Sequence, residues 1–269
     1  MVCYPRPMSD APRVSYETPL PHVVVVRLAR PSKLNAFDVG MLRQLAQAYT
    51  RYEDDPSARC MVLCSEGEHF TAGLDLAEVG PKVAGGELLF PDGLVDPLGL
   101  QGRQRTKPVL VAARGWCLTI GIELMLAADI RLAADDTRFG QIEINRGIFP
   151  FGGATLRFPQ IAGWGNAMRW LLTGDKFDAT EARRLGLVQE ITAPDALESR
   201  ALSLAQTIAS RAPLGVQATL TSARSAIENS FETGATALQG QIEALMATED
   251  AAEGVRSFID RREAKFKGR

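Results

Sequence analysis

Short apolar runs alternate with helix-like periodicities along the first half of the chain. Apolar, often β-branched runs that predict buried strands occur at residues 22–29, 59–65, 108–114 and 129–134. Asp38 offers a side-chain cap for a helix that continues to about Asp54. The apolar positions of this helix recur at three- and four-residue intervals, at Leu42, Leu45, Tyr49 and Tyr52. The alternation indicates an α/β fold in which helices cover parallel strands.

The second half of the pattern is mostly helical. Candidate helices cover residues 163–173, 178–185, 194–212, 214–228, 232–247 and 249–264, with one strand-like run at 187–191. Asp178, with Glu181 three residues later, predicts a capping box. Before this half, residues 80–105 are rich in glycine and proline, which is typical of a mobile loop over a site.

Two glutamates stand in apolar surroundings. Glu123 lies within the largely apolar segment 115–129, and Glu143 lies between two isoleucines. An ionised carboxylate costs several kcal/mol to bury, so a chain seldom keeps one there without a partner or a chemical use. A strand-like run separates the two, and we expect both side chains to converge on one site. Taken singly, Glu123 would equally suit a helix start or a pair with Arg131.

Composition excludes several classes of protein. Hydrophobic residues make up 46% of the 269 and charged residues 23%, which is typical of an ordinary globular protein. A net charge of −2 gives no electrostatic footprint for nucleic acid or for an anionic membrane. No apolar run approaches the roughly 18 residues of a membrane span, and Pro5, Pro7 and Pro12 interrupt any signal-peptide core. We therefore expect a cytoplasmic protein.

Cysteine and histidine usage narrows the chemistry. The four cysteines, at positions 3, 60, 64 and 117, form no CxxC pair, which argues against a zinc site and against a disulfide framework. The two histidines, His22 and His69, lie near no serine motif, which disfavours a Ser-His-Asp hydrolase. His69 is interpreted as a bystander in a loop, and no metal is expected.

Several motifs, each weak alone, are highly specific in this order and spacing. From Val23 to the C-terminus the chain resembles the crotonase, or enoyl-CoA hydratase/isomerase, superfamily. The matching segments are 30–36 (RPSKLNA), 70–76 (FTAGLDL), 107–109 (KPV), 115–129, 140–143 (GQIE), 150–153 (PFGG), 172–174 (LTG), 179–188 (ATEARRLGLV) and 258–266 (FIDRREAKF).

The resemblance implies a fold and an assembly. A spiral of ββα turns would occupy residues 14–195, preceded by a tail at 1–13 and followed by a helical trimerisation region at 196–269. The family forms homotrimers, often paired into hexamers. Its substrate is an acyl-coenzyme A thioester, so coenzyme A arrives with the substrate and no separate cofactor is expected.

The resemblance also assigns roles in the site. Backbone N–H groups of Leu74 and Ile120 would form an oxyanion hole for the thioester oxygen. Glu123 would activate water as a base and Glu143 would protonate the α-carbon, as in hydratases that convert trans-2-enoyl-CoA to 3-hydroxyacyl-CoA. Most members have three glycines where this chain has Thr119-Ile120-Gly121, and we expect the larger side chains to crowd the thioester.

Other residues are implied in substrate binding. They are Ala72, Gly73, Asp75, Leu76, Trp116, Gly121, Arg30 and Lys33. Lys265 and Lys267 are further candidates for the phosphates of coenzyme A, with a solvated charged face as the alternative.

Three alternatives stay open. Glu143 would also suit an ion pair with Arg146 or Arg157. The same scaffold supports double-bond isomerisation and other enolate chemistry, although isomerases commonly keep only one acidic group. Some relatives bind coenzyme A or RNA without evident catalysis, and the replaced glycines motivate that reading, whereas the acidic charge balance opposes it.

Overall fold

The computed structural model describes residues 12–269. Most of the tail predicted at 1–13 therefore lies outside the described residues. The main sheet has six strands in the order β1-β2-β3-β4-β6-β9. Their bounds are Val14–Leu20 (β1), Val23–Leu28 (β2), Cys60–Ser65 (β3), Val109–Ala113 (β4), Ile130–Ala134 (β6) and Glu190–Thr192 (β9). Only β1 runs antiparallel to its neighbour, and the other pairs are parallel. The strands predicted from apolar runs are confirmed as β2, β3, β4 and β6.

The main sheet buries both of its faces, which explains why its strands are continuous apolar runs. Along β2, Val24 and Val26 belong to the cluster that includes α1 (Val39–Asp54), whereas Val23 and Val25 belong to the cluster under α7 (Leu197–Ala209). The edge strand β1 was not predicted. Its residues are half-buried or exposed, so it lacks the apolar run that marked the others.

A second, smaller sheet contains the strand that leads into the helix carrying Glu123. Its strands are β5 (Trp116–Leu118), β7 (Arg138–Gly140) and β8 (Phe177–Asp178), in that order. Strands of two or three residues show no readable periodicity, and none of these was predicted. Helix α3 (Ile120–Ala127) begins almost directly after β5 and is apolar on nearly all sides, as expected of a helix surrounded by protein.

Further helices pack around the sheets. They are α2 (Leu76–Ala84), α4 (Ala154–Ala162), α5 (Trp164–Thr173) and α6 (Ala179–Arg184), with 3-10 turns η1 (Pro31–Lys33) and η2 (Glu143–Arg146). Both predicted N-caps are confirmed, because Asp38 accepts from the N–H of Met41 and Asp178 from the N–H of Glu181. The return bond of the predicted capping box is not formed among the described residues, because the Glu181 carboxylate accepts from Arg184 instead. Helix α4 was not predicted, and α2 takes up the first residues of the segment expected to be a loop.

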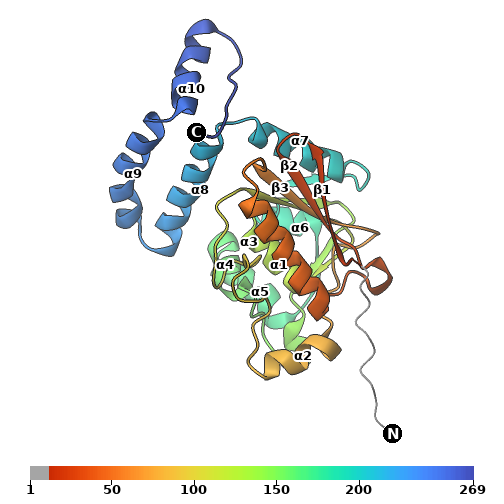
Figure 1. The fold of residues 1–269 in the computed structure, drawn as a ribbon. Helices are drawn as coiled ribbons and strands as arrows, with labels where there is room; N and C mark the ends of the chain where they lie inside the picture. The colour runs from red at the N-terminus through yellow and green to blue at the C-terminus, as the bar shows by residue number, and fades with distance from the viewer. Residues whose placement is uncertain (1–11) are drawn as a thin grey trace.

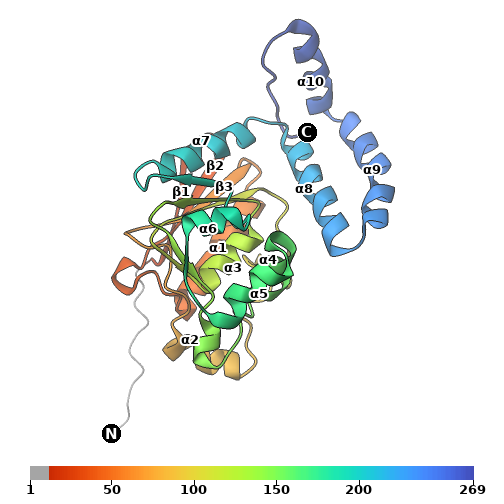
Figure 2. The same ribbon diagram turned by 180° about the vertical axis from the view of Figure 1, so that it is seen from behind.

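The C-terminal helices stand away from the core (Figures 1 and 2). Helices α8 (Pro213–Glu228) and α9 (Phe231–Met246) lie antiparallel as a hairpin, and α10 (Glu249–Asp260) continues beyond them. No residue of α8 is buried. The helix expected to reach residue 264 ends earlier, where Arg261 adopts a left-handed φ of 52°. The boundary drawn at 195/196 stays a prediction, and α7, which follows it, packs on the main sheet.

No helix within residues 12–269 combines the length and the apolarity needed to cross a bilayer.

Candidate active site

The two glutamates meet at one small cavity of about 180 Å³. Residues from α2, α3, η2 and the loops around them line it, namely Ala72, Leu74, Leu76, Thr119, Ile120, Glu123, Ile142, Glu143, Arg146, Ile148 and Phe151. Helix α3 supplies Glu123 on its first turn, and η2 supplies Glu143 at its first residue. The cavity thus collects both glutamates and both residues whose amides were predicted to form the oxyanion hole.

Glu123 is almost completely buried, at 4% exposure, and is held by backbone amides. Its Oε1 accepts from the N–H of Gly152 at 2.6 Å and from that of Ala154 at 3.4 Å. Burial raises the pKa of Glu123 to about 7, although these two hydrogen bonds oppose the shift. A Cβ at position 152 would lie 2.2 Å from Oε2 of Glu123, so glycine is required there by close approach.

The alternative partner of Glu123 is engaged elsewhere. Arg131 donates from its guanidinium to the carbonyl oxygens of Leu187, Ala128 and Gly186. The structure therefore does not support the ion pair between Glu123 and Arg131.

Glu143 is also buried, at 7% exposure, and contacts a glutamine that was not singled out from the sequence. Burial raises the pKa of Glu143 to about 8, and the nearby charge of Glu123 adds to the shift. The side-chain amide of Gln141, with its NH₂ group facing the acceptors, donates to Oε1 and Oε2 of Glu143 at 2.9 and 3.1 Å. Within residues 12–269 Glu143 forms no ion pair with Arg146 or Arg157.

The same Gln141 amide reaches the peptide of the expected oxyanion donor. It donates to the carbonyl oxygen of Thr119 at 3.3 Å, and that carbonyl shares its peptide group with the N–H of Ile120. Gln141 is completely buried and lies two residues before Glu143 in the quoted GQIE segment. That spacing was the available signal, but the direction of its side chain follows only from the fold.

Two backbone amides are free at the cavity. Neither the N–H of Leu74 nor that of Ile120 donates a hydrogen bond within the described chain. The N–H of Ile120 opens helix α3, where the first amides have no intrahelical partner and the dipole favours negative charge. Such a pair of unpaired donors suits an oxygen that gains negative charge in the reaction.

Thr119 tolerates a backbone conformation that favours glycine. Its φ is 51° and its ψ is −115°, in a region that β-branched residues seldom adopt. Its hydroxyl is buried without a hydrogen-bond partner among residues 12–269. A Cβ at Gly73 would lie 2.3 Å from that hydroxyl, and Gly73 has a φ of +106°. The larger Thr119 side chain is thus accommodated against a glycine, and the cavity beside it stays open.

Several residues predicted to bind substrate do not line this cavity. Arg30 is 3.3 Å from the carboxylates of both Asp75 and Asp38. The backbone N–H of Trp116 donates to Nδ1 of His69, and Nζ of Lys176 lies 4.3 Å from the centre of the Trp116 ring. These residues support the turns that form the site, and their contact with substrate stays a prediction.

Other residues predicted to bind substrate also have structural roles or lie exposed at the surface. A Cβ at Gly121 would lie 2.7 Å from Thr71, so that glycine allows α3 to pack closely. Lys33 ends η1 as an exposed residue. Lys267 lies 3.7 Å from the exposed carboxylate of Glu249. The phosphate contacts suggested for these lysines stay predictions.

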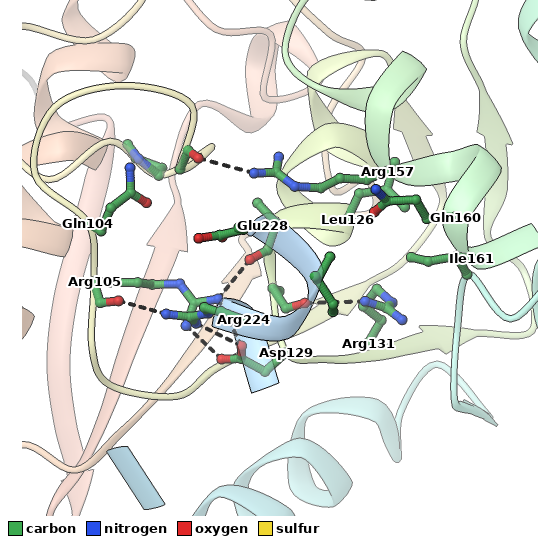
Figure 3. Close-up of a pocket in the computed structure, with 15 residues that line it drawn as sticks. Gln104, Arg105, Leu126, Asp129, Arg131, Arg157, Gln160, Ile161, Arg224 and Glu228 are labelled. Carbon is green, nitrogen blue, oxygen red and sulfur yellow. Dashed lines mark hydrogen bonds and ion pairs between the residues drawn. The ribbon is translucent and has the colours of Figure 1, made fainter. Parts of the chain in front are cut away.

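A larger cavity of about 620 Å³ lies elsewhere, between the end of α3, α4 and α8 (Figure 3). Neither catalytic candidate lines it, although four arginines do. Arg105 and Arg224 both pair with Asp129, at 2.6 and 3.0 Å, and Arg157 donates to the carbonyl of Gly99. We interpret this cavity as the junction that holds α8 to the core, because Asp129 pairs there with Arg224 of α8 and with Arg105 of the core.

Comparison with known proteins agrees with the fold and the motifs. The family described as enoyl-CoA hydratase/isomerase matches residues 21–269. Enoyl-CoA hydratase EchA19 of Mycobacterium tuberculosis is 34% identical over 253 residues, covering 92% of this chain and 94% of that protein. Mevalonyl-coenzyme A hydratase SIDH of Beauveria bassiana is 35% identical over 259 residues, covering 93% and 92%.

Solved structures give the same result. A crystal structure of a probable enoyl-CoA hydratase/isomerase from Mycobacterium abscessus is 50% identical, with a TM-score of 0.94 and coverage of 97% of this chain and 100% of that one. The α/β fold class and the resemblance inferred from the motifs are therefore confirmed, and the trimerisation role of the C-terminal helices stays a prediction. This chain belongs to the enoyl-CoA hydratase/isomerase family.

Proposed function

We propose that the protein is an enoyl-CoA hydratase, which adds water to a trans-2-enoyl-CoA thioester to give a 3-hydroxyacyl-CoA. One observation carries the proposal: two buried carboxyl groups with raised pKa values share a small cavity with two unpaired backbone amides. Relatives named as enoyl-CoA and crotonyl-CoA hydratases support it.

The amides provide the electrostatic part of the mechanism. Attack of water at the β-carbon moves electrons toward the thioester carbonyl, whose oxygen becomes an enolate. The N–H groups of Leu74 and Ile120 would donate to this oxygen, and the start of helix α3 adds a favourable field. A preorganised donor of this kind is worth roughly 3 to 4 kcal/mol in the transition state.

The carboxyl groups provide the proton transfers. Glu123, ionised, takes a proton from the attacking water, while Glu143, protonated, gives its proton to the α-carbon. Burial raises the pKa of both groups, and the charge of Glu123 raises that of Glu143 further, which favours a protonated Glu143 beside an ionised Glu123. The Gly152 amide holds one oxygen of Glu123 and leaves the other for water.

The proposal is tested by mixing purified protein with crotonyl-CoA and following loss of the conjugated thioester absorbance. We expect loss of absorbance and, in heavy-oxygen water, one labelled oxygen in the product. A shifted double bond without label would instead indicate an isomerase. Binding of coenzyme A thioesters without turnover across an acyl panel would indicate a non-catalytic member of the family. Retention of RNA at moderate salt would indicate an RNA-binding member.

The exposed apolar side chains of the C-terminal helices support a homotrimer, or a hexamer of paired trimers. Phe231 on α9 is 82% exposed, and Phe258 and Ile259 on α10 are 85% and 71% exposed. Isolated protomers would leave these side chains in water, which favours association. Light scattering should therefore give a mass three or six times the 29.1 kDa of one chain. A monomer mass would contradict the assembly but not the reaction.

We also propose a metabolic role and a cellular location for the protein. An acyl-CoA substrate suits fatty acid metabolism in the cytoplasm, and coenzyme A would enter only as part of that substrate. Within residues 12–269 no group of three or more histidine, cysteine, aspartate or glutamate side chains is placed to hold a metal ion.

A further inference from the structure

A second cavity adjoins the catalytic one and shares a wall with it. It measures about 160 Å³ and lies under the segment that follows α2. Phe151 lines both this cavity and the catalytic cavity. The second cavity is otherwise walled mainly by apolar side chains, including those of Val83, Leu88, Leu89, Phe90, Leu94 and Leu98.

The size of the catalytic cavity limits what it can hold. Its volume of about 180 Å³ is small beside the roughly 300 to 1,000 Å³ of most ligand pockets. The reacting part of a crotonyl thioester needs this much space for its acyl carbons, its carbonyl oxygen and the added water. A longer acyl chain must therefore leave the cavity, and the apolar space on the other side of Phe151 is the adjoining one.

The backbone next to Phe151 is held in place by its contacts with Glu123. The next residue, Gly152, donates its N–H to Glu123 at 2.6 Å, and its α-carbon has no room for a side chain there. Moving the backbone to open the wall would disturb the catalytic base. The phenyl ring itself is half-buried, so rotation or removal of the ring is the route that leaves Glu123 in place.

Resting on the proposed hydratase function, we infer that Phe151 sets the acyl-chain length. With the ring in place, the protein acts on short enoyl-CoA thioesters of about four carbons. Without the ring, the two cavities join and longer straight chains fit. The second cavity adds about 160 Å³, which nearly doubles the space and would admit several further methylene groups.

The charged residues of the second cavity also bear on the chemistry of the chain. Glu87, Asp92 and Asp96 line it beside the apolar residues. Glu87 pairs with Lys82 at 2.9 Å, and the Asp96 carboxylate accepts from the N–H groups of Leu98 and Leu100. Asp92 is therefore the carboxylate that would repel an acyl chain ending in a carboxylate. The occupant after removal of the ring is therefore an unsubstituted alkyl tail.

The test is a series of trans-2-enoyl-CoA substrates of 4, 6, 8, 10 and 12 carbons, assayed with the wild type and with Phe151→Ala. The wild type should show its highest kcat/KM at four carbons. Because each buried methylene favours binding by roughly fourfold, Phe151→Ala should raise the ratio of ten-carbon to four-carbon kcat/KM by about tenfold or more. Phe149→Ala is the matched control, since Phe149 is 60% exposed and lines neither cavity, and it should leave the ratio unchanged.

Binding separates this inference from the proposed reaction. Calorimetry with saturated butyryl-CoA and decanoyl-CoA reports chain-length preference without turnover. If no enoyl-CoA is hydrated but Phe151→Ala still gains affinity for decanoyl-CoA, the reaction assignment fails and the role of Phe151 stands. If crotonyl-CoA is hydrated while the chain-length profile of Phe151→Ala matches the wild type, the role of Phe151 is refuted. Equal wild-type activity on four and ten carbons refutes it as well.

A folding defect must be distinguished from a change of specificity. Circular dichroism and the thermal midpoint of Phe151→Ala should be compared with the wild type. Phe151→Leu keeps apolar contact but shortens the side chain, and it should shift the profile toward six and eight carbons. A well-folded Phe151→Leu with an unchanged profile contradicts the inference even where Phe151→Ala is poorly folded.

Discussion

Glu123→Gln and Glu143→Gln are each expected to lower kcat for crotonyl-CoA hydration by about 10²- to 10⁴-fold, the usual contribution of a positioned acid or base. A glutamine has nearly the same shape as glutamate but cannot take up or release the proton. The amide oxygen at position 123 can still accept from Gly152, so the cavity should keep its form. Because substrate binding depends on other groups, KM should change little. Initial rates from the absorbance assay measure both parameters.

The control for this pair is the same chemical change outside the catalytic cavity. Glu228 lines the larger cavity at the end of α8 and is exposed, so Glu228→Gln should retain wild-type kcat. If both catalytic-site variants keep wild-type turnover, the assigned roles are wrong. If only Glu143→Gln keeps it, another acid protonates the α-carbon.

Asp129→Asn is expected to lower the free energy of unfolding by about 3 to 5 kcal/mol, because it leaves a buried charge without its counterion. Arg105 is 8% exposed and pairs with the carboxylate of Asp129 at 2.6 Å. The same carboxylate accepts from Arg224 of α8 at 3.0 Å and from the N–H of Val109 at 2.8 Å. Burial would raise the pKa of Asp129, but the adjacent arginines lower it below its usual value, so the group is ionised in the fold.

Urea denaturation at one fixed protein concentration measures this effect, since an oligomer's stability depends on concentration. Asp54→Asn is the matched control, because Asp54 pairs with Arg103 where both side chains are largely exposed. Solvent screens such a pair, so its removal should move the midpoint little. A midpoint for Asp129→Asn that equals the control would show that Arg105 finds another partner. The attachment of α8 to the core would then depend less on this junction, whose residues Arg105, Asp129 and Arg224 are labelled in Figure 3.

The core strands and the first long helix could be predicted because burial leaves a local signal. The run of valines in β2 is apolar on both faces, and the periodic Leu42, Leu45 and Tyr49 mark the buried side of α1. Strand β1 and the short strands β5, β7 and β8 escaped prediction. An edge strand shows little apolar pattern, and a strand of three residues is defined by its neighbours rather than by its own sequence.

The sequence by itself determined the family and the candidate catalytic residues. Two glutamates in apolar segments, glycine turns beside them and the order of the motifs led to the family and to the candidate catalytic pair. What only the tertiary structure decided is how those residues are held. The hydrogen bond from the Gly152 N–H to Glu123 joins segments that are far apart in the sequence. The hydrogen bonds from the Gln141 side chain to Glu143 depend on the direction of that side chain. The position of Phe151 between two cavities depends on how separate segments pack. The physical reason is that periodicity records whether a residue is buried, whereas hydrogen-bond partners and cavity walls depend on distances that arise only when separate elements pack together.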